Sequence, residues 1–241
     1  RSDTEIVMHG MQPGTYRSNY PGEDIRHAGF QHLHSLQFLA AAVRAEDEGF
    51  DAYAISTLPD PGLREIRSLL RIPVVGYGES AMLTSCLLGS RFAVLVFINE
   101  LTDLLADNAR KYGLGERLVG VSDVGFRFTD VLSGFSDPAP LIERFRAAAR
   151  VQIAAGAEVI IPGEAPLCVL LATHGISSVD GVPVLDSLSC WIKQAELLVD
   201  LKRTSGIERC QRGYFNEPPP RERLREVLDF YKLDRFGQQG A

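Results

Sequence analysis

The sequence has no apolar run long enough to cross a lipid bilayer. Its longest runs, such as Phe92 to Ile98, fall far short of the roughly 20 consecutive apolar residues that a membrane helix needs. A charged segment followed by an apolar one, the pattern of a secretion leader, is also missing. These absences predict a cytoplasmic protein that makes no membrane contact.

Cysteine is scarce. The chain has four cysteines, and none shows the C-x-x-C spacing that is typical of zinc and redox sites: Cys86, Cys168, Cys190 and Cys210. Four cysteines in 241 residues are also too few for a disulfide scaffold. We therefore expect free thiols in a reducing compartment.

Positive charge is in short supply, because 25 Lys and Arg face 31 Asp and Glu and the net charge is −6. Nucleic-acid binding rests on clustered basic side chains that neutralise phosphates, so no such partner is expected. His27, His32 and His34 are close in the sequence, but they flank the start of a predicted helix, lie on different faces and lack an acidic ligand pair. No bound metal is expected there.

The composition is that of an ordinary globular protein, with 45% hydrophobic and 23% charged residues. Short apolar strands alternate with amphipathic helices, which predicts an α/β fold with parallel sheets covered on both faces. The predicted strands are 5–8, 52–56, 72–76, 92–98, 118–124, 158–161 and 182–185. The predicted helices are 30–48, 61–70, 80–88, 101–112, 141–155, 166–173, 187–201 and 221–231.

One pattern occurs twice. DAYAISTLPDPGL at 51–63 and AEVIIPGEAPL at 157–167 each read as a buried strand that ends in a turn rich in proline and glycine. Placing Gly49 on Gly156, an offset of 107 (156 − 49), also places Thr57 on Glu164 (164 − 57). Reactive groups in open α/β sheets gather at such strand ends. The two halves therefore present different side chains at one equivalent place.

A second matched pair supports a duplicated α/β unit. Ile-Pro-Val-Val at 72–75 and Val-Pro-Val-Leu at 182–185 correspond at an offset of 110 (183 − 73), in the same order as the first pair.

Six short motifs follow one another in an order that resembles the aspartate/glutamate/hydantoin racemase superfamily, closest to its hydantoin racemase branch. They are Asp-Pro-Gly-Leu (60–63), Ile-Pro-Val-Val-Gly-x-Gly-Glu (72–79), Leu-Gly-x-Arg-Phe-x-Val (88–94), Gly-Ala-Glu-x-Ile (156–160), Gly-Val-Pro-Val-Leu-Asp (181–186) and Thr-Ser-Gly (204–206). The resemblance spans roughly residues 45 to 218.

This resemblance implies two pseudo-symmetric α/β domains with a small-molecule site in the cleft between them, no metal or organic cofactor, and a homo-oligomer. We place the first domain at 1–97 plus 204–241 and the second at 98–203. The family's first strand, expected before Thr4, is missing from this sequence. Family members carry two cysteines that flank the substrate α-carbon, one removing a proton and the other returning one from the opposite face.

The chain departs from the family at both cysteines, where it has Thr57 and Glu164. A threonine hydroxyl is a poor proton acceptor without a neighbouring base, and it suits a hydrogen-bond partner better. A carboxyl group in a partly dry site has a raised pKa, which suits a general acid/base. We therefore expect Glu164 to act alone on a small carboxylate or a cyclic amide or imide, by isomerisation or by ring-opening hydrolysis.

Two alternatives remain open. Racemisation can be retained if Cys168, one helical turn beyond Glu164, supplies the missing base. A thiol at such a position is, however, more often a small buried apolar group. The chain can also be a binding protein that has lost the chemistry, although burying a carboxylate without a purpose is costly.

Several further residues are expected to contact the substrate. Gly78, Glu79 and Ser80 begin a predicted helix after a strand, so their N–H groups and the hydroxyl suit a substrate oxygen, with ordinary helix capping by Ser80 as the other interpretation. The turn at 60–62 shapes the pocket wall or is simply a turn. The other candidates are Pro59, Gly163 and Ala165 beside the Thr57 and Glu164 positions, Asn99 after a strand, and Tyr16 in a long first loop.

Overall fold

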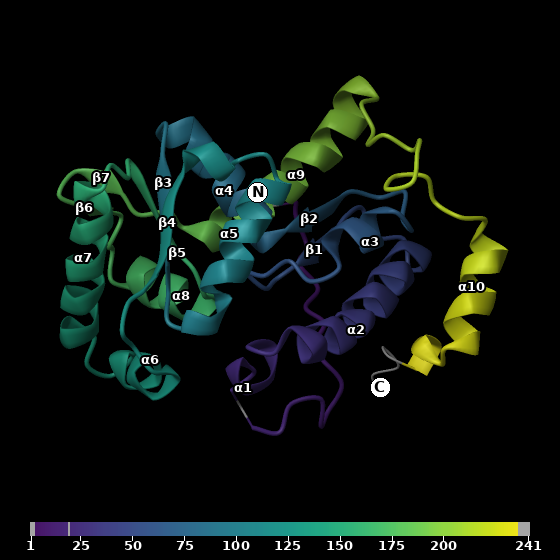
Figure 1. The fold of residues 1–241 in the computed structure, drawn as a ribbon. Coiled ribbons are helices and arrows are strands. Elements are labelled where there is room, and N and C mark those ends of the chain that lie inside the picture. Colours follow the sequence, from purple (N-terminus) through teal and green to yellow (C-terminus); the bar gives the residue numbers. More distant parts are fainter. Residues whose placement is uncertain (1–2, 19, 236–241) are drawn as a thin grey trace. The chain divides into compact units, whose positions relative to one another are not determined.

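The structure is a computed structural model, and it describes residues 3–18 and 20–235. They form two compact units (Figure 1). Unit 1 contains the residues up to Ile55, residues 61–75 and those from Lys193 onward. Unit 2 contains residues 56–60 and 76–192. The domain boundaries predicted at 97/98 and 203/204 stay a prediction.

Unit 1 joins the N-terminal and C-terminal parts of the chain. Its elements are α1 (Gly22–Ile25), α2 (Ala28–Asp47), β1 (Tyr53–Ile55), α3 (Leu63–Arg67), β2 (Val74–Gly76), the later part of α9 (Ser187–Ser205), α10 (Arg221–Phe230) and η3 (Leu233–Arg235). Strands β1 and β2 form a two-stranded sheet. The predicted strand at 5–8 is wrong, because this segment is irregular and exposes Ile6, Val7 and Met8. Apolar residues alone do not make a strand where no neighbouring strand pairs with them.

Helix α10 docks on α2 within unit 1. The Arg221 guanidinium contacts Glu46 at 3.0 Å and Asp47 at 2.6 Å, and it donates to the Val43 carbonyl oxygen at 2.8 Å. Leu224 and Leu228 on the same helix are buried. The terminal helix thus packs on the first part of the chain.

Unit 2 is built on a three-stranded parallel sheet with the order β4-β3-β5. Its elements are α4 (Tyr77–Leu88), β3 (Phe92–Val96), η1 (Asn99–Leu101), α5 (Thr102–Lys111), η2 (Gly115–Arg117), β4 (Leu118–Asp123), α6 (Phe128–Gly134), α7 (Ala139–Ala154), β5 (Val159–Pro162), α8 (Ala165–Thr173), β6 (Ser178–Val179), β7 (Val182–Pro183) and the first part of α9. All five residues of β3 are buried, as its unbroken apolar sequence predicts for a central strand.

The strand order determines where a site can form. The connection from β3 to β4 runs through α5, and the connection from β4 back across to β5 runs through α7. Right-handed crossovers in opposite directions place their helices on opposite faces, and Figure 1 shows α5 and α7 on opposite sides of the sheet. Ligands bind at the carboxyl ends of the strands where the direction reverses, which here means the ends of β3 and β5.

The internal repeat is visible in the backbone. Helices α2 and α7 both end at a glycine in the left-handed region, Gly49 (φ 87°) and Gly156 (φ 99°). The next residue of each half closes the helix end with the same bond, Phe50 to the Ala45 oxygen and Ala157 to the Gln152 oxygen, 107 residues apart. Each glycine leads into a strand, β1 or β5, so the predicted equivalence extends to the backbone conformation.

Three details of unit 2 differ from the prediction. Helix α6 lies between the predicted strand 118–124 and the predicted helix 141–155, where the sequence predicts no helix. The strand predicted at 182–185 is reduced to β7 and a parallel bridge between Val184 and Ile160. Helix α4 begins at Tyr77, so Ser80 lies inside the first turn and does not cap it.

The helices within the described ranges include none that is long and apolar enough to span a membrane.

Candidate active site

Glu164 is held at the carboxyl end of β5, immediately before α8. Its carboxylate accepts the Phe97 N–H at 3.0 and 3.1 Å on its two oxygens, and the Ile98 N–H at 3.0 Å on Oε1. Those N–H groups directly follow β3, the neighbouring strand. The side chain is therefore fixed across the two strand ends at which the sheet topology favours a site.

The pKa of Glu164 lies near neutrality. Burial raises it from the ordinary value of 4.5 to about 7, although the N–H groups of Ile98 and Phe97 act in the opposite direction. The carboxylate of Asp123 at the end of β4 adds a smaller upward contribution. A carboxyl group that is half ionised near pH 7 can both accept and donate a proton at that pH.

Thr57 begins a tight turn after β1. The Asp60 N–H donates to the Thr57 carbonyl oxygen at 3.0 Å, and the Thr57 side chain is half-buried. Among the described residues, no hydrogen bond reaches its hydroxyl group. That hydroxyl has both a donor and lone pairs to offer to a ligand.

The turn that carries Thr57 packs against the segment that carries Glu164. A Cβ atom on Gly163 would lie 3.0 Å from Leu58 Cδ2 and 2.8 Å from Val96 Cγ1. Leu58 follows Thr57 directly, and Gly163 precedes Glu164 directly. The two positions that the repeat aligns thus belong to neighbouring segments, and only glycine fits between them at 163.

The N–H groups predicted to hold a substrate oxygen are already occupied. The carboxylate of Asp60 accepts the Gly78 N–H at 3.0 Å and the Glu79 N–H at 2.7 Å. These two N–H groups are therefore engaged by Asp60 in this structure, and the predicted contacts of Gly78 and Glu79 with a substrate stay predictions. Asp60 lies outside α4 and accepts N–H groups of its first turn, which have no partner within the helix. This explains why α4 begins at Tyr77, three residues before Ser80, the predicted start.

Cys168 is poorly suited to act as a base. It is buried in α8, and its sulfur lies 3.8 Å from Asp186 Oδ1. Burial raises the pKa of the thiol, and the negative charge of Asp186 raises it further. The thiolate that proton abstraction needs is disfavoured in these surroundings.

A group of aromatic and hydroxyl side chains adjoins Cys168. The buried Tyr77 hydroxyl lies beside Cys168 and Ser187, and it makes no hydrogen bond of good geometry with any described residue. The Tyr77 ring is 6.3 Å from the Trp191 ring. The Trp191 indole nitrogen is likewise buried, without a hydrogen bond to the part of the chain that the structure describes. Burial, and then the nearby thiol, raises the pKa of Tyr77, so its hydroxyl stays protonated.

The remaining predicted residues lie in different surroundings. Pro59 is buried, Ala165 is half-buried at the start of α8, and Asn99 is exposed in η1. Ser80 is buried in α4. Tyr16 belongs to unit 1, where its ring meets that of His34 at 5.2 Å. The predicted contacts of these residues with a substrate stay predictions.

Sequence reasoning gave no role to the N–H groups of Phe97 and Ile98, to Asp123, or to Tyr112, whose hydroxyl donates to Asp60 Oδ2 at 2.8 Å. Backbone N–H groups have no sequence signal of their own. Asp123 ends a strand next to β3, a position that strand order alone reveals. In the described part of the chain, no group of three or more His, Cys, Asp or Glu is arranged to hold a metal ion.

Comparison with known proteins gives a consistent family. The profile of the family described as Asp/Glu/Hydantoin racemase matches residues 3–195. The chain is 30% identical over 212 residues to a hydantoin racemase of Pseudomonas sp. (strain NS671), covering 86% of this chain and 80% of that protein. It is 27% identical over 196 residues to a hydantoin racemase of Paenarthrobacter aurescens, covering 80% and 78%.

Solved structures show the same fold. An allantoin racemase from Pseudomonas fluorescens matches with a TM-score of 0.64 at 28% identity, covering 76% of this chain and 77% of that one. An allantoin racemase from Klebsiella pneumoniae matches with a TM-score of 0.67 at 21% identity, covering 80% and 75%.

Proposed function

Because this chain belongs to the Asp/Glu/hydantoin racemase family, we propose that it catalyses proton transfer at the α-carbon of a small cyclic amide, with Glu164 as its only general acid/base. The observation that carries the proposal is the buried carboxylate of Glu164, which has a pKa near neutrality and lies at the end of β5. The resemblance to the family predicts a cysteine at this position. Relatives named hydantoin racemase and allantoin racemase suggest a ring with a carbonyl group beside the reacting carbon.

The hydrogen bonds of Glu164 identify the oxygen that would take the proton. Oε1 accepts two N–H groups at 3.0 Å, whereas among the described residues Oε2 has only the shared contact with Phe97 at 3.1 Å. A carboxylate has about four lone-pair positions, so Oε2 keeps more capacity for a substrate proton. The hydrogen bonds from the Phe97 and Ile98 N–H groups hold the carboxylate in place during the transfer.

In the proposed reaction, Oε2 takes the α-proton, the C–H bond breaks, and its electrons move onto the neighbouring carbonyl oxygen. The Thr57 hydroxyl donates a hydrogen bond to that oxygen as it becomes negative. The carbonyl then re-forms as the α-carbon regains a proton from Glu164 or from solvent. The proposed steps need no organic cofactor, because every proton in them has a named donor or acceptor.

The carboxamide substitution E164Q tests the proposal directly. The glutamine oxygen can still accept the hydrogen bonds that Oε1 accepts from the two N–H groups, but an amide cannot take up the proton. We expect turnover of hydantoin-type substrates, and exchange of their α-proton in deuterated water, to fall by roughly 10²–10⁴-fold. Chiral chromatography and NMR measure the two rates.

The control for E164Q is C168A, because Cys168 is buried beside a carboxylate and has no role in the proposed reaction. We expect this variant to retain the wild-type rate. Full turnover by E164Q would refute the role of Glu164, and loss of turnover only in C168A would favour a thiol base. A product heavier by one water molecule would show ring-opening hydrolysis, and tight ligand retention without turnover would show a binding protein.

A further inference from the structure

Asp60 joins two parts of unit 2 that carry candidate site residues. It is buried, and its carboxylate accepts three hydrogen bonds: Gly78 N–H on Oδ1 at 3.0 Å, Glu79 N–H on Oδ2 at 2.7 Å, and the Tyr112 hydroxyl on Oδ2 at 2.8 Å. Its own N–H closes the turn on Thr57. Its backbone is in the left-handed region (φ 50°), which aspartate tolerates better than most residues.

Backbone packing leaves this turn little room to move. A Cβ atom on Gly76 would lie 2.6 Å from Asp60 Cγ, and one on Gly78 would collide with the Leu58 carbonyl oxygen. Two glycines therefore allow the turn to lie directly against the start of α4. The position of Thr57 depends on this fit.

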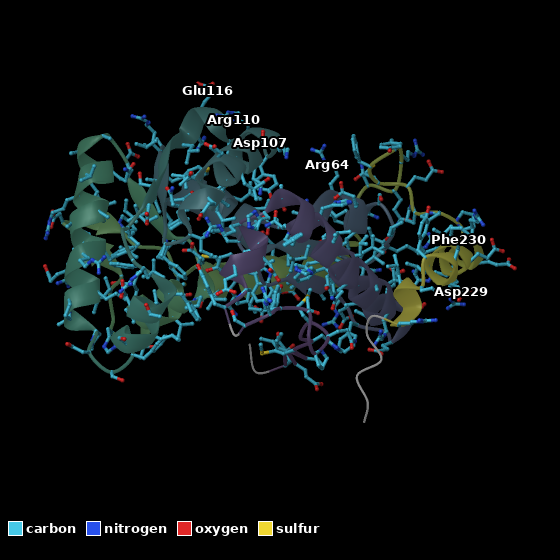
Figure 2. The ribbon with its side chains drawn as sticks, turned by 60° about the horizontal axis from the view of Figure 1, so that its bottom comes forward. Arg64, Asp107, Arg110, Glu116, Asp229 and Phe230 are labelled. Atoms are coloured by element: carbon cyan, nitrogen blue, oxygen red, sulfur yellow. The ribbon has the colours of Figure 1, made fainter. Side chains whose placement is uncertain are left out.

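Helix α5 clamps the same turn from another direction. The Asn108 side chain donates to the Pro59 carbonyl oxygen at 2.9 Å, and the Tyr112 hydroxyl reaches Asp60. Asn108 is in α5 and Tyr112 directly follows its last residue, four positions later, so the two side chains share one face of the helix. The opposite face carries Asp107 and Arg110, which Figure 2 shows pointing away from the protein.

We propose that Asp60 is a positioning residue for catalysis, which fixes the Thr57 hydroxyl by tying its turn to the start of α4 and, through Tyr112, to the end of α5. This inference rests on the proposed function of the Thr57 and Glu164 site. Asp60 contacts no reacting atom in this assignment. It acts only through the turn at 57–60.

Asparagine is a poor replacement for Asp60, although it has the same shape. An amide has one oxygen, whereas Asp60 uses both of its oxygens to accept backbone N–H groups. In D60N the amide nitrogen therefore faces one of these N–H groups, and the turn shifts. Y112F is the milder change, since it removes one donor and leaves both backbone bonds in place.

The test is a double-mutant cycle with T57V, measured as kcat and KM on a hydantoin substrate. We expect D60N to lower kcat about tenfold or more and Y112F less, because small misplacement of a catalytic group is costly. In the T57V background the same substitutions should change kcat less than about twofold, since there is no hydroxyl left to misplace. R110A, on the outer face of α5, is the control, and it should leave kcat unchanged relative to the parent protein in each background.

Each outcome has a separate meaning. An equal loss of kcat with and without the Thr57 hydroxyl would overturn the positioning role, because a general effect on folding does not depend on Thr57. If D60N does not fold, the Y112F and T57V cycle decides alone. Full turnover by E164Q refutes the proposed function instead, and an inactive E164Q with additive D60N and T57V losses refutes only the inference about Asp60.

Discussion

For Glu164, burial and hydrogen bonding act in opposite directions on one carboxyl group, and burial prevails. The three contacts with N–H groups favour the charged form, but removal from water disfavours it more strongly and brings the pKa to about 7. A catalytic carboxyl group gains reactivity at neutral pH from this balance. The same balance makes the folded state sensitive to pH.

We predict that Glu164 makes the protein less stable as the pH rises from about 4.5 to about 7. Below that range the carboxyl group is protonated in both the folded and the unfolded chain. Within it, the unfolded chain loses the proton first, because its pKa is the ordinary 4.5 whereas the folded value is about 7. The difference corresponds to on the order of 3 kcal/mol in the free energy of unfolding.

Urea unfolding of wild type and E164Q between pH 4 and 8 measures this contribution. The stability of wild type relative to E164Q should fall as the pH rises, because glutamine does not titrate. Parallel stability curves for the two proteins would show that Glu164 has an ordinary pKa.

Asp123 has a smaller effect on the pKa of Glu164 than burial has. Its negative charge raises the pKa of Glu164, so D123N should move the acidic limb of the pH–rate profile to lower pH by less than about one unit. Activity at pH 6 should increase, and added salt should reduce the difference between the two proteins. E116Q is the control, because Glu116 points outward from η2 in Figure 2. If the acidic limb does not move in D123N, the charge of Asp123 does not affect the pKa of Glu164.

Gly163 is a packing requirement of the site. In G163A the new methyl group would lie 2.8 Å from Val96 Cγ1 and 3.0 Å from the Leu95 carbonyl oxygen. We expect a loss of about 1–3 kcal/mol in the free energy of unfolding, measured in urea. G29A is the control, since a methyl group at Gly29 meets nothing within 4 Å and should be neutral or stabilising. Equal stability of the two variants would contradict the packing.

At the scale of elements, the docking of α10 on α2 depends on one arginine. R221A removes the contacts with Glu46, Asp47 and the Val43 carbonyl oxygen, and should lower the free energy of unfolding by about 1–3 kcal/mol. R223A, which loses only the exposed pair with Glu226, should cost less than about 1 kcal/mol. If both substitutions cost the same, α10 is not held by Arg221.

The sequence predicts most elements because the features that define them are local. Apolar β3 and β5, and the helix ends at Gly49 and Gly156, follow from neighbouring residues alone. The start of α4 does not, because the group that binds its N–H groups is Asp60, about 18 residues earlier in the chain. Sequence reasoning chose Ser80 as the local cap, and the true partner is distant.

For the molecule as a whole, the repeat located both strand-end positions, but the surroundings of those positions could not be predicted. Glu164 is the example: its type and place were expected, whereas its bonds to Phe97 and Ile98 depend on β3 lying beside β5. The strand order that creates this neighbourhood comes from the crossovers of α5 and α7. Pairing of strands across such distances is a property of the fold and not of either segment.

Helix α9 has one more consequence. It runs unbroken from Ser187 to Ser205, passes from unit 2 into unit 1 after Ile192, and carries Trp191, the single tryptophan of the chain. The protein therefore has a built-in fluorophore at the point where its two units share a helix. The emission wavelength of Trp191, and energy transfer to it from Tyr77 at 6.3 Å, report on the packing of α9 within unit 2 without an added label.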